Sequence, residues 1–213
     1  MAKSSLSKMK GYSLYIFDLD GTLVDSANGL VVSYRKALDK MGLLYDESCL
    51  AEFTREPLYA TFSRFERPGI DYKTFEEVMF DEYRLSLDPN SFPFPDTRYA
   101  LQRIADEGLP MCVATRSSSK RARNVMTIHK IIQYIDHTVG YDNVARQKPD
   151  PECLKVCMAH YSIRKDGVLF VGDGETDMMA AEAFGIDGAL IDRNDLGGDC
   201  RCTYRIKSLR ELF

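Results

Sequence analysis

The sequence predicts an α/β fold in which helices pack against a parallel β-sheet. Four short, continuous apolar runs are typical of strands that are buried on both faces of a sheet. They occur at residues 13–17, 110–115, 168–171 and 188–191. Three stretches with apolar residues at helical spacing lie between them, at residues 97–107, 151–161 and 176–184. Strands that alternate with helices in this way indicate a parallel sheet.

Glycines and prolines mark the ends of these predicted helices. One helical stretch stops before Gly108 and another before Gly185, and glycine commonly follows the last turn of a helix. Pro149 or Pro151 can start the helix over 151–161, because proline suits the first helical turn. Each helix therefore has a boundary signal in addition to its periodic apolar pattern.

The segment from 27 to 90 interrupts the alternation of strands and helices. It has no convincing strand, but its apolar residues recur at helical spacing, as in Leu30, Tyr34, Leu38 and Met41. Gly42 is well placed to end this first helix, and the proline-rich run 88–96 would return the chain to the sheet. We therefore predict a core domain over 1–26 and 91–213 and a helical insertion over 27–90. The aromatic residues of the insertion are expected to form its own small core: Tyr45, Phe53, Tyr59, Phe62 and Phe65.

Composition favours a globular, cytoplasmic protein. The chain has 213 residues, of which 45% are hydrophobic, and this suits one domain with a modest insertion. A net charge of −4 gives no general electrostatic reason to expect nucleic acid or a membrane surface as a partner. The apolar run at 14–17 is too short for a signal peptide or a membrane span. The six cysteines are expected to be reduced thiols, while a redox role for Cys200 and Cys202 stays open.

Polar side chains follow three of the predicted strands, at the point where each strand ends. Asp18 and Asp20 follow the first, Thr115 follows the second, and Asp173 and Asp177 follow the third. Because ligands of open α/β sheets bind at the carboxyl ends of the strands, these residues predict a site at that edge.

The chemistry of these residue types favours phosphoryl transfer. Several carboxylates at one edge would repel one another without a cation, and Mg²⁺ is a hard ion that carboxylates and phosphate oxygens bind. Lys148, which precedes the helix over 151–161, could neutralise charge on the phosphoryl group, and the Thr115 hydroxyl could hold its oxygens. One carboxylate could be the nucleophile and another the general acid and base. In isolation, Asp18 and Asp20 would be read as an ordinary turn after a strand.

Four motifs resemble those of the haloacid dehalogenase (HAD) superfamily. They are "DLDGTLVDS", "VATRSS", "QKPDP" and "GDGETD", and they occur in the order and spacing of that superfamily. The chain is most similar to its phosphoglycolate-phosphatase-like branch. The resemblance implies a Rossmann-like core with the segment 27–90 as a helical cap, which would close over the site and carry substrate specificity.

Matching positions imply the catalytic roles. Asp18 would be the nucleophile and a Mg²⁺ ligand, and Asp20 would be the acid and base, binding the metal through its backbone carbonyl. Thr115 and Lys148 would bind the phosphoryl group. The presence of an aspartate at position 20 favours phosphate chemistry over carbon–halogen cleavage, because dehalogenases lack this second aspartate.

The resemblance also extends to metal and substrate residues. Asp173 would complete the metal site, and Asp177 would be either a ligand or a support for the ligands; its alternative is a carboxylate favoured by the helix dipole. Arg55 falls where related caps present a specificity loop, although an ordinary polar turn is equally compatible with the sequence. Arg116 replaces the asparagine common in this branch and could add an anion contact or point to solvent.

The basic run over 117–123 allows two interpretations. It could bind an anionic substrate or nucleic acid, but no aromatic residues interleave with the charges. We therefore expect it to be the solvated start of a core helix.

The leading interpretation is a Mg²⁺-dependent phosphatase that hydrolyses a small soluble phosphomonoester through an aspartyl-phosphate. A phosphomutase would use the same intermediate but pass the phosphoryl group to a sugar hydroxyl. A non-catalytic binding protein is disfavoured, because competent residues fill all four motifs. The expected partner is a small phosphorylated molecule, and the sequence indicates neither the substrate nor the oligomeric state.

Overall fold

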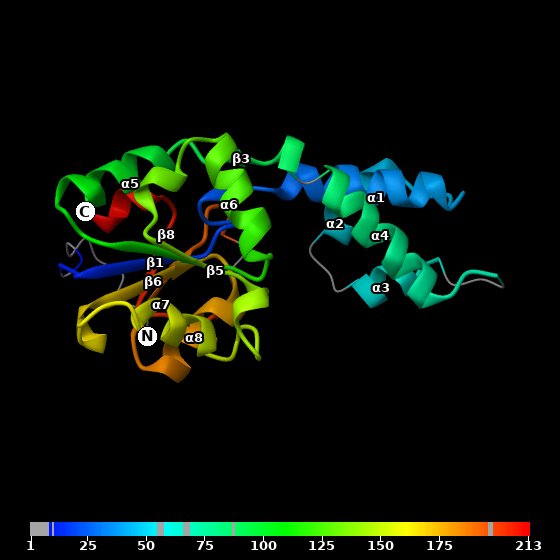
Figure 1. Cartoon of the computed structure of the whole chain (residues 1–213). Helices are drawn as coiled ribbons and strands as arrows, with labels where there is room; N and C mark the ends of the chain where they lie inside the picture. Colours follow the sequence, from blue (N-terminus) through cyan, green and yellow to red (C-terminus); the bar gives the residue numbers. More distant parts are fainter. Residues whose placement is uncertain (1–8, 10, 55–57, 66–68, 87, 196–197) are drawn as a thin grey trace. The chain divides into compact units, whose positions relative to one another are not determined.

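The computed structural model describes residues 9, 11–54, 58–65, 69–86, 88–195 and 198–213. The chain divides into two compact units, and each is described by itself (Figure 1). The first unit comprises the chain up to Val24 together with Pro93–Phe213, and the second comprises Asp25–Phe92.

A parallel sheet forms the centre of the first unit. Among the described residues it has six strands in the order β5-β4-β1-β6-β7-β8, and every neighbouring pair is parallel. The strands are β1 (Leu14–Phe17), β4 (Met111–Ala114), β5 (His137–Val139), β6 (Val168–Gly172), β7 (Asp187–Ile191) and β8 (Tyr204–Ile206). The predicted α/β class with a parallel sheet is thus confirmed.

The two outer strands, β5 and β8, were missed by the sequence analysis. Each has only three residues, and each carries a polar residue in its middle, Thr138 in β5 and Arg205 in β8. Strands at a sheet edge are half solvated, so they lack the continuous apolar run that marked the buried strands.

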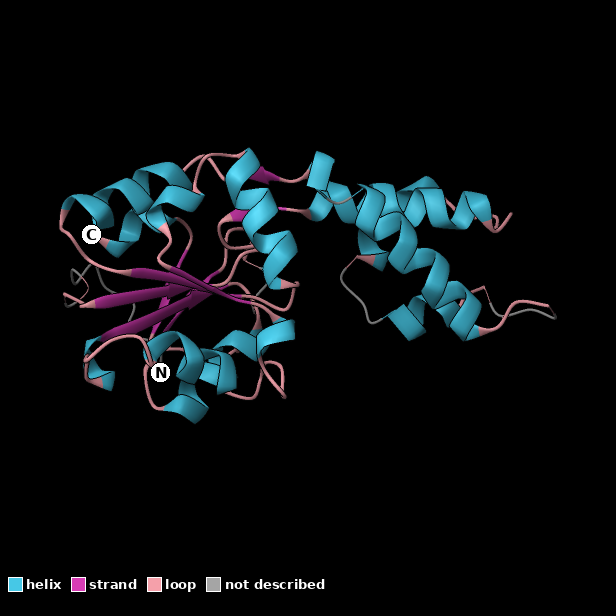
Figure 2. Ribbon diagram, in the orientation of Figure 1, coloured by secondary structure: helices cyan, strands magenta, loops and turns pink. Residues whose placement is uncertain are grey.

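Helices cover both faces of the sheet (Figure 2). They are α5 (Thr97–Asp106), α6 (Ser119–Ile128), α7 (Glu152–Met158) and α8 (Glu175–Phe184). Side chains of α5 and α6 share one buried cluster with Phe17, while side chains of α7 and α8 share another with Ile16. Successive residues of a strand point to opposite faces, so β1 contributes to both layers of the core.

The register of the strands brings their carboxyl ends to one edge. Phe17, the last residue of β1, is level with Val113 of β4 on one side and with Val171 of β6 on the other. The residues that follow these three strands therefore emerge next to one another.

The second unit is helical, and its core is aromatic. Its helices are α1 (Ala27–Lys40), α2 (Leu50–Phe53), α3 (Leu58–Ser63) and α4 (Tyr72–Ser86). Phe53, Phe62 and Phe75 are buried between them, and Tyr45 and Phe65 pack against this cluster. Tyr59 was expected in the core but is 66% exposed. Helix α3 has only six residues, and its buried side chains are Thr61 and Phe62.

Short elements complete the chain. Strands β2 (Val24–Asp25) and β3 (Phe92–Pro93) form a separate two-stranded sheet. The 3₁₀ helices are η1 (Glu47–Cys49), η2 (Asp88–Asn90), η3 (Ile132–Tyr134), η4 (Tyr141–Asn143), η5 (Lys165–Gly167) and η6 (Leu209–Leu212). Over the described part of the chain, we find no helix with the length and hydrophobicity needed to cross a membrane.

Candidate active site

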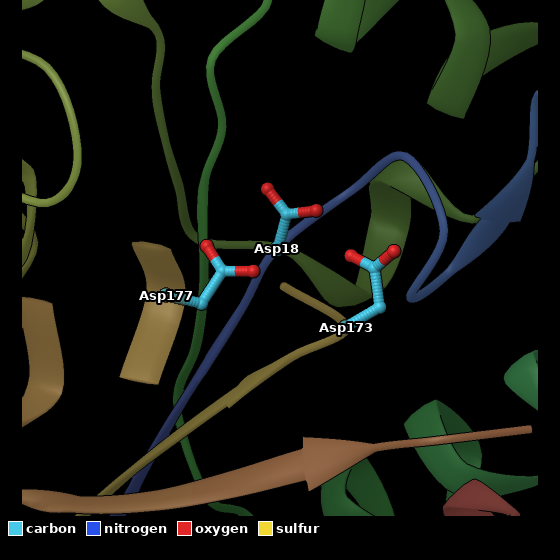
Figure 3. Close-up of side chains that lie close together, drawn as sticks. All are labelled: Asp18, Asp173 and Asp177. Carbon is cyan, nitrogen blue, oxygen red and sulfur yellow. The ribbon is translucent and has the colours of Figure 1, made fainter. Parts of the chain in front are cut away.

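Three carboxylates from two strand ends meet at the carboxyl edge of the sheet. Asp18 follows β1, Asp173 follows β6, and Asp177 lies in the first turn of α8. One carboxylate oxygen of each lies within 4.8 Å of the others. Figure 3 shows the three side chains close together. Asp18 and Asp177 are buried, while Asp173 reaches the surface.

Two glycines make room for this cluster. A Cβ atom on Gly21, whose φ is +88°, would lie 2.1 Å from Oδ2 of Asp173. A Cβ atom on Gly172 would lie 2.5 Å from the Cβ atom of Asp177. Any larger residue at either position would have to displace a carboxylate, so the motifs need glycine for steric reasons.

Hydrogen bonds orient the carboxylates further. Oδ2 of Asp177 accepts a hydrogen bond of 3.0 Å from the backbone N–H of Gly174, which precedes α8. The Thr22 hydroxyl donates to Oδ1 of Asp173 over 3.4 Å. Asp177 therefore fixes the start of its own helix while its other oxygen faces the cluster.

Lys148 is buried beside two of the carboxylates. Its Nζ lies 2.6 Å from Oδ1 of Asp18 and 2.6 Å from Oδ1 of Asp177, and it donates to the carbonyl of Ala114 over 3.0 Å. Its side chain is only 2% exposed. Burial acts to lower the pKa of Lys148, but Asp18 and Asp177 outweigh it, so the pKa is raised and the ammonium stays charged.

The pKa values of Asp18 and Asp173 are raised. Burial raises the pKa of Asp18 well above its usual value, and Asp177 and Asp173 add to this effect while Lys148 opposes it. Desolvation and the charge of Asp177 raise the pKa of Asp173 to about 6. Within the cluster, three carboxylates face the single ammonium of Lys148. This excess of hard, anionic oxygen atoms suits a divalent metal ion.

Thr115 lies at the neighbouring strand end. It is buried, and its backbone N–H donates to the carbonyl of Val139 in β5. Its Oγ1 accepts a 3.0 Å hydrogen bond from the N–H of Ser117, so the hydroxyl is held at the start of the loop that leads to α6. Arg116, between them, is exposed.

Asp20 is held separately from the three-carboxylate cluster. Arg121, in the first turn of α6, donates from both terminal nitrogens to its carboxylate, over 2.7 and 2.9 Å, and Ser117 Oγ donates over 2.9 Å. The basic run 117–123 does begin a core helix, but Arg121 is not solvated as expected: its side chain is 14% exposed. The third helical residue of α6 points back toward the strand ends, and this position is the signal that could have revealed it.

Of the residues predicted for the site, the structure brings Asp18, Lys148, Asp173 and Asp177 together. Arg55 lies outside the described residues, as do the two residues that follow it.

Comparison with known proteins identifies the family. The model of the haloacid dehalogenase-like hydrolase family matches residues 15–191. The phosphoglycolate phosphatase of Photorhabdus laumondii is 30% identical over 184 residues, which cover 83% of this chain and 79% of that protein. The phosphoglycolate phosphatase of Yersinia pseudotuberculosis is 31% identical over 187 residues, covering 84% and 80% of the two chains.

Solved structures show the same fold. A haloacid dehalogenase-like family hydrolase from Streptococcus pneumoniae superimposes with a TM-score of 0.80 at 18% identity, covering 96% of this chain and 98% of the other. The family match includes β4, β5, β6 and β7, all of β1 except its first residue, and the three residues of the carboxylate cluster, while β8 lies beyond it. The chain therefore belongs to the haloacid dehalogenase-like hydrolases.

Proposed function

We propose that this protein is a phosphatase that hydrolyses small phosphomonoesters through an aspartyl-phosphate on Asp18. The observation that carries the proposal is the buried Asp18 carboxylate, 2.6 Å from the Lys148 ammonium at the carboxyl edge of a parallel sheet. Relatives at 30% and 31% identity that are named phosphoglycolate phosphatase support a phosphorylated substrate.

The side chains divide the reaction between them. Asp18 attacks phosphorus, so that a bond from its carboxylate to phosphorus forms while the bond to the leaving oxygen breaks. Asp20 gives a proton to that oxygen and later takes one from the water that releases phosphate. Lys148 offsets negative charge on the phosphoryl oxygens, and the Thr115 hydroxyl holds one of them.

The carboxylate cluster fits Mg²⁺. Asp18, Asp173 and Asp177 offer oxygen ligands within 4.8 Å of one another, and one nearby ammonium leaves their charge incompletely balanced. We infer that Asp18 and Asp173 would hold the ion, with Asp177 as a ligand or a support and with the backbone carbonyl of Asp20. When bound, Mg²⁺ supplies positive charge to the phosphoryl group.

The second compact unit is the proposed cap. We infer that the segment 27–90, whose described helices include α1 to α4, acts as the cap that selects the substrate. Arg55 in this segment and Arg116 after β4 are proposed to recognise the rest of the substrate, because guanidinium groups bind carboxylate and phosphate in a fork.

A phosphate-release assay tests the proposal. The purified protein is incubated with p-nitrophenyl phosphate and with a panel of alkyl phosphomonoesters that includes phosphoglycolate. Release is expected with Mg²⁺, and it is expected to stop with a chelator and in Asp18→Asn. Asp166→Asn is the matched control, since Asp166 is in η5 at the opposite edge of the sheet.

Two results would contradict the proposal. One is full activity in Asp18→Asn, because that result would show that Asp18 is not the nucleophile. The other is isomerisation of a sugar phosphate without net release of phosphate, which would show a phosphomutase.

A further inference from the structure

The carboxylate of Asp20 has an unusually complete set of donors. Two nitrogens of Arg121 bind its two oxygens at 2.7 and 2.9 Å, and Ser117 Oγ adds a hydrogen bond of 2.9 Å. The side chains of Arg121 and Asp20 are 14% and 25% exposed. A two-pronged guanidinium–carboxylate contact at this degree of burial fixes the carboxylate in position and in plane.

The donors are themselves fixed. Arg121 Nη1 donates to Ser117 Oγ over 2.6 Å, and the backbone N–H of Arg121 donates to Ser118 Oγ, the N-cap of α6. The N–H of Ser117 binds the Thr115 hydroxyl, and the carbonyl of Ser117 accepts from the N–H of Tyr141. The loop after β4 therefore holds Thr115 and the two partners of Asp20 as one connected group.

A third segment braces this loop. Both carboxylate oxygens of Asp142 bind Ser119, one at its N–H and one at its hydroxyl, each over 2.7 Å. Gly140 lies so close that a Cβ atom there would be 2.2 Å from the backbone nitrogen of Ser119. The first turn of α6, which carries Arg121, is thus tightly constrained by packing and by hydrogen bonds.

We propose that Arg121, assisted by Ser117, is the positioning residue for Asp20. Arg121 need not touch substrate; it sets where the Asp20 carboxyl group stands when a proton passes to the leaving oxygen and when a proton is taken from water. In the first step, the electron pair of the broken ester bond goes to the leaving oxygen, which receives the Asp20 proton. In the second, water forms a new bond to phosphorus, loses a proton to Asp20 and releases Asp18. This inference rests on the proposed phosphatase function.

Leaving-group dependence separates positioning from a structural role. The kcat/KM of a phosphatase of this kind reports the steps up to release of the alcohol. An alkoxide needs a proton to leave, whereas p-nitrophenolate leaves without one. In Arg121→Met, kcat/KM is expected to fall about 100-fold for the best alkyl phosphate of the panel, and less than about threefold for p-nitrophenyl phosphate.

A pre-steady-state measurement gives a second readout. Hydrolysis of the aspartyl-phosphate still needs a positioned base, so Arg121→Met is expected to show a burst of p-nitrophenol followed by slow turnover. Arg121→Lys should recover part of the alkyl phosphate activity, because an ammonium can reach one oxygen of Asp20 but not bind both in a fork. Lys120→Met is the matched control, because Lys120 is an exposed basic residue on the same helix.

The outcomes are distinct. An equal loss on both substrates, or no loss on either, would overturn the positioning role while leaving the phosphatase proposal intact. Absence of phosphate release by the wild-type protein on every substrate would overturn both. If Arg121→Met fails to fold, Ser117→Ala replaces it, because this variant removes one donor to Asp20 and leaves the ion pair with Arg121. Its kcat/KM should again fall more for the alkyl phosphate than for p-nitrophenyl phosphate, but by a smaller factor.

Discussion

At the scale of single residues, the Lys148 ammonium has an acceptor for each of its three hydrogens. Its ammonium is buried between Asp18 and Asp177 and bound to the carbonyl of Ala114. These three charge-assisted contacts hold the ammonium in place beside the proposed nucleophile.

Replacement of Lys148 by methionine tests this role. The variant keeps the length of the side chain but removes the charge, and phosphatase kcat/KM is expected to fall at least about 100-fold, the usual cost of a preorganised electrostatic group. Lys155→Met, an exposed lysine on α7, is the control and should retain wild-type kcat/KM. Near-normal activity in Lys148→Met would refute the assigned role.

The two ends of β6 provide a matched test of the steric argument. A Cβ atom on Gly172 would lie 2.5 Å from Asp177, whereas one on Gly167, just before the strand, would have its nearest neighbour at 3.4 Å. Gly172→Ala is expected to lower the free energy of unfolding by about 1–3 kcal/mol, as overpacking does, and Gly167→Ala by less than about 1 kcal/mol. Urea denaturation measures both, and equal costs would contradict the steric explanation.

At the scale of elements, α6 begins close to the candidate site and carries Arg121, which binds Asp20. Its N-cap, Ser118, has extended backbone and accepts a hydrogen bond from the N–H of Arg121. One backbone N–H of the first turn therefore has a hydrogen-bond partner. The same turn places the Arg121 side chain within hydrogen-bonding distance of Asp20.

Loss of this cap should be measurable. Ser118→Ala is expected to lower the free energy of unfolding by about 1 kcal/mol, the typical cost of removing a serine cap. Ser162→Ala, at an exposed position between α7 and η5, is the control and should change stability by less than about 0.5 kcal/mol. Equal values for the two variants would show that the cap does not support the helix.

Continuous apolar runs predicted the strands that are buried on both faces. The strands over Leu14–Phe17 and Val168–Gly172 could be recognised in the sequence because all of their residues are buried and nearly all are apolar. The edge strand His137–Val139 could not be recognised in this way, because two of its three residues are only partly buried and two of them are polar. A pattern of apolar residues thus indicates which segments are buried, but it does not indicate which segments hydrogen-bond as strands at the edge of a sheet.

The same distinction holds for the site. Asp18 and Asp173 could be placed near one another because both directly follow neighbouring buried strands. The contact between Asp20 and Arg121 spans 101 positions and depends on how one loop turns into a helix. The local signal for this direction is the place of Arg121 in the first turn of the helix, and it can be used only once the first residue of the helix is known. The basic run by itself was therefore interpreted as an ordinary solvated helix start.

At the scale of the whole molecule, two carboxyl groups of the cluster make stability depend on pH. The pKa of Asp173 is raised to about 6, and that of Asp18 is also raised. A carboxyl group with a raised pKa binds its proton more tightly in the folded state, so stability falls as pH rises from its unfolded pKa near 4 through its folded pKa.

Thermal unfolding at several pH values, with and without Mg²⁺, should show the effects of pH and of the metal ion on stability. Without metal, Tm is expected to fall from this source between about pH 4 and pH 6. Mg²⁺ binds the ionised carboxylates, so the rise in Tm that it produces should be larger at pH 7.5 than at pH 5. Asp173→Asn should weaken the pH dependence and most of the Mg²⁺ effect. A rise in Tm that is the same at both pH values would contradict a carboxylate site.

The position of β1 has a consequence for motion. This strand is central in the sheet and buries side chains in both helical layers, and the N–H of Asp18 continues its ladder by donating to the carbonyl of Val171. Segments with this degree of burial exchange their amide hydrogens only when the whole domain opens. The amide of Asp18 should therefore be among the last to exchange with deuterium. The proposed nucleophile is thus attached to the slowest-opening part of the first unit, and local fluctuations cannot carry it away from the site.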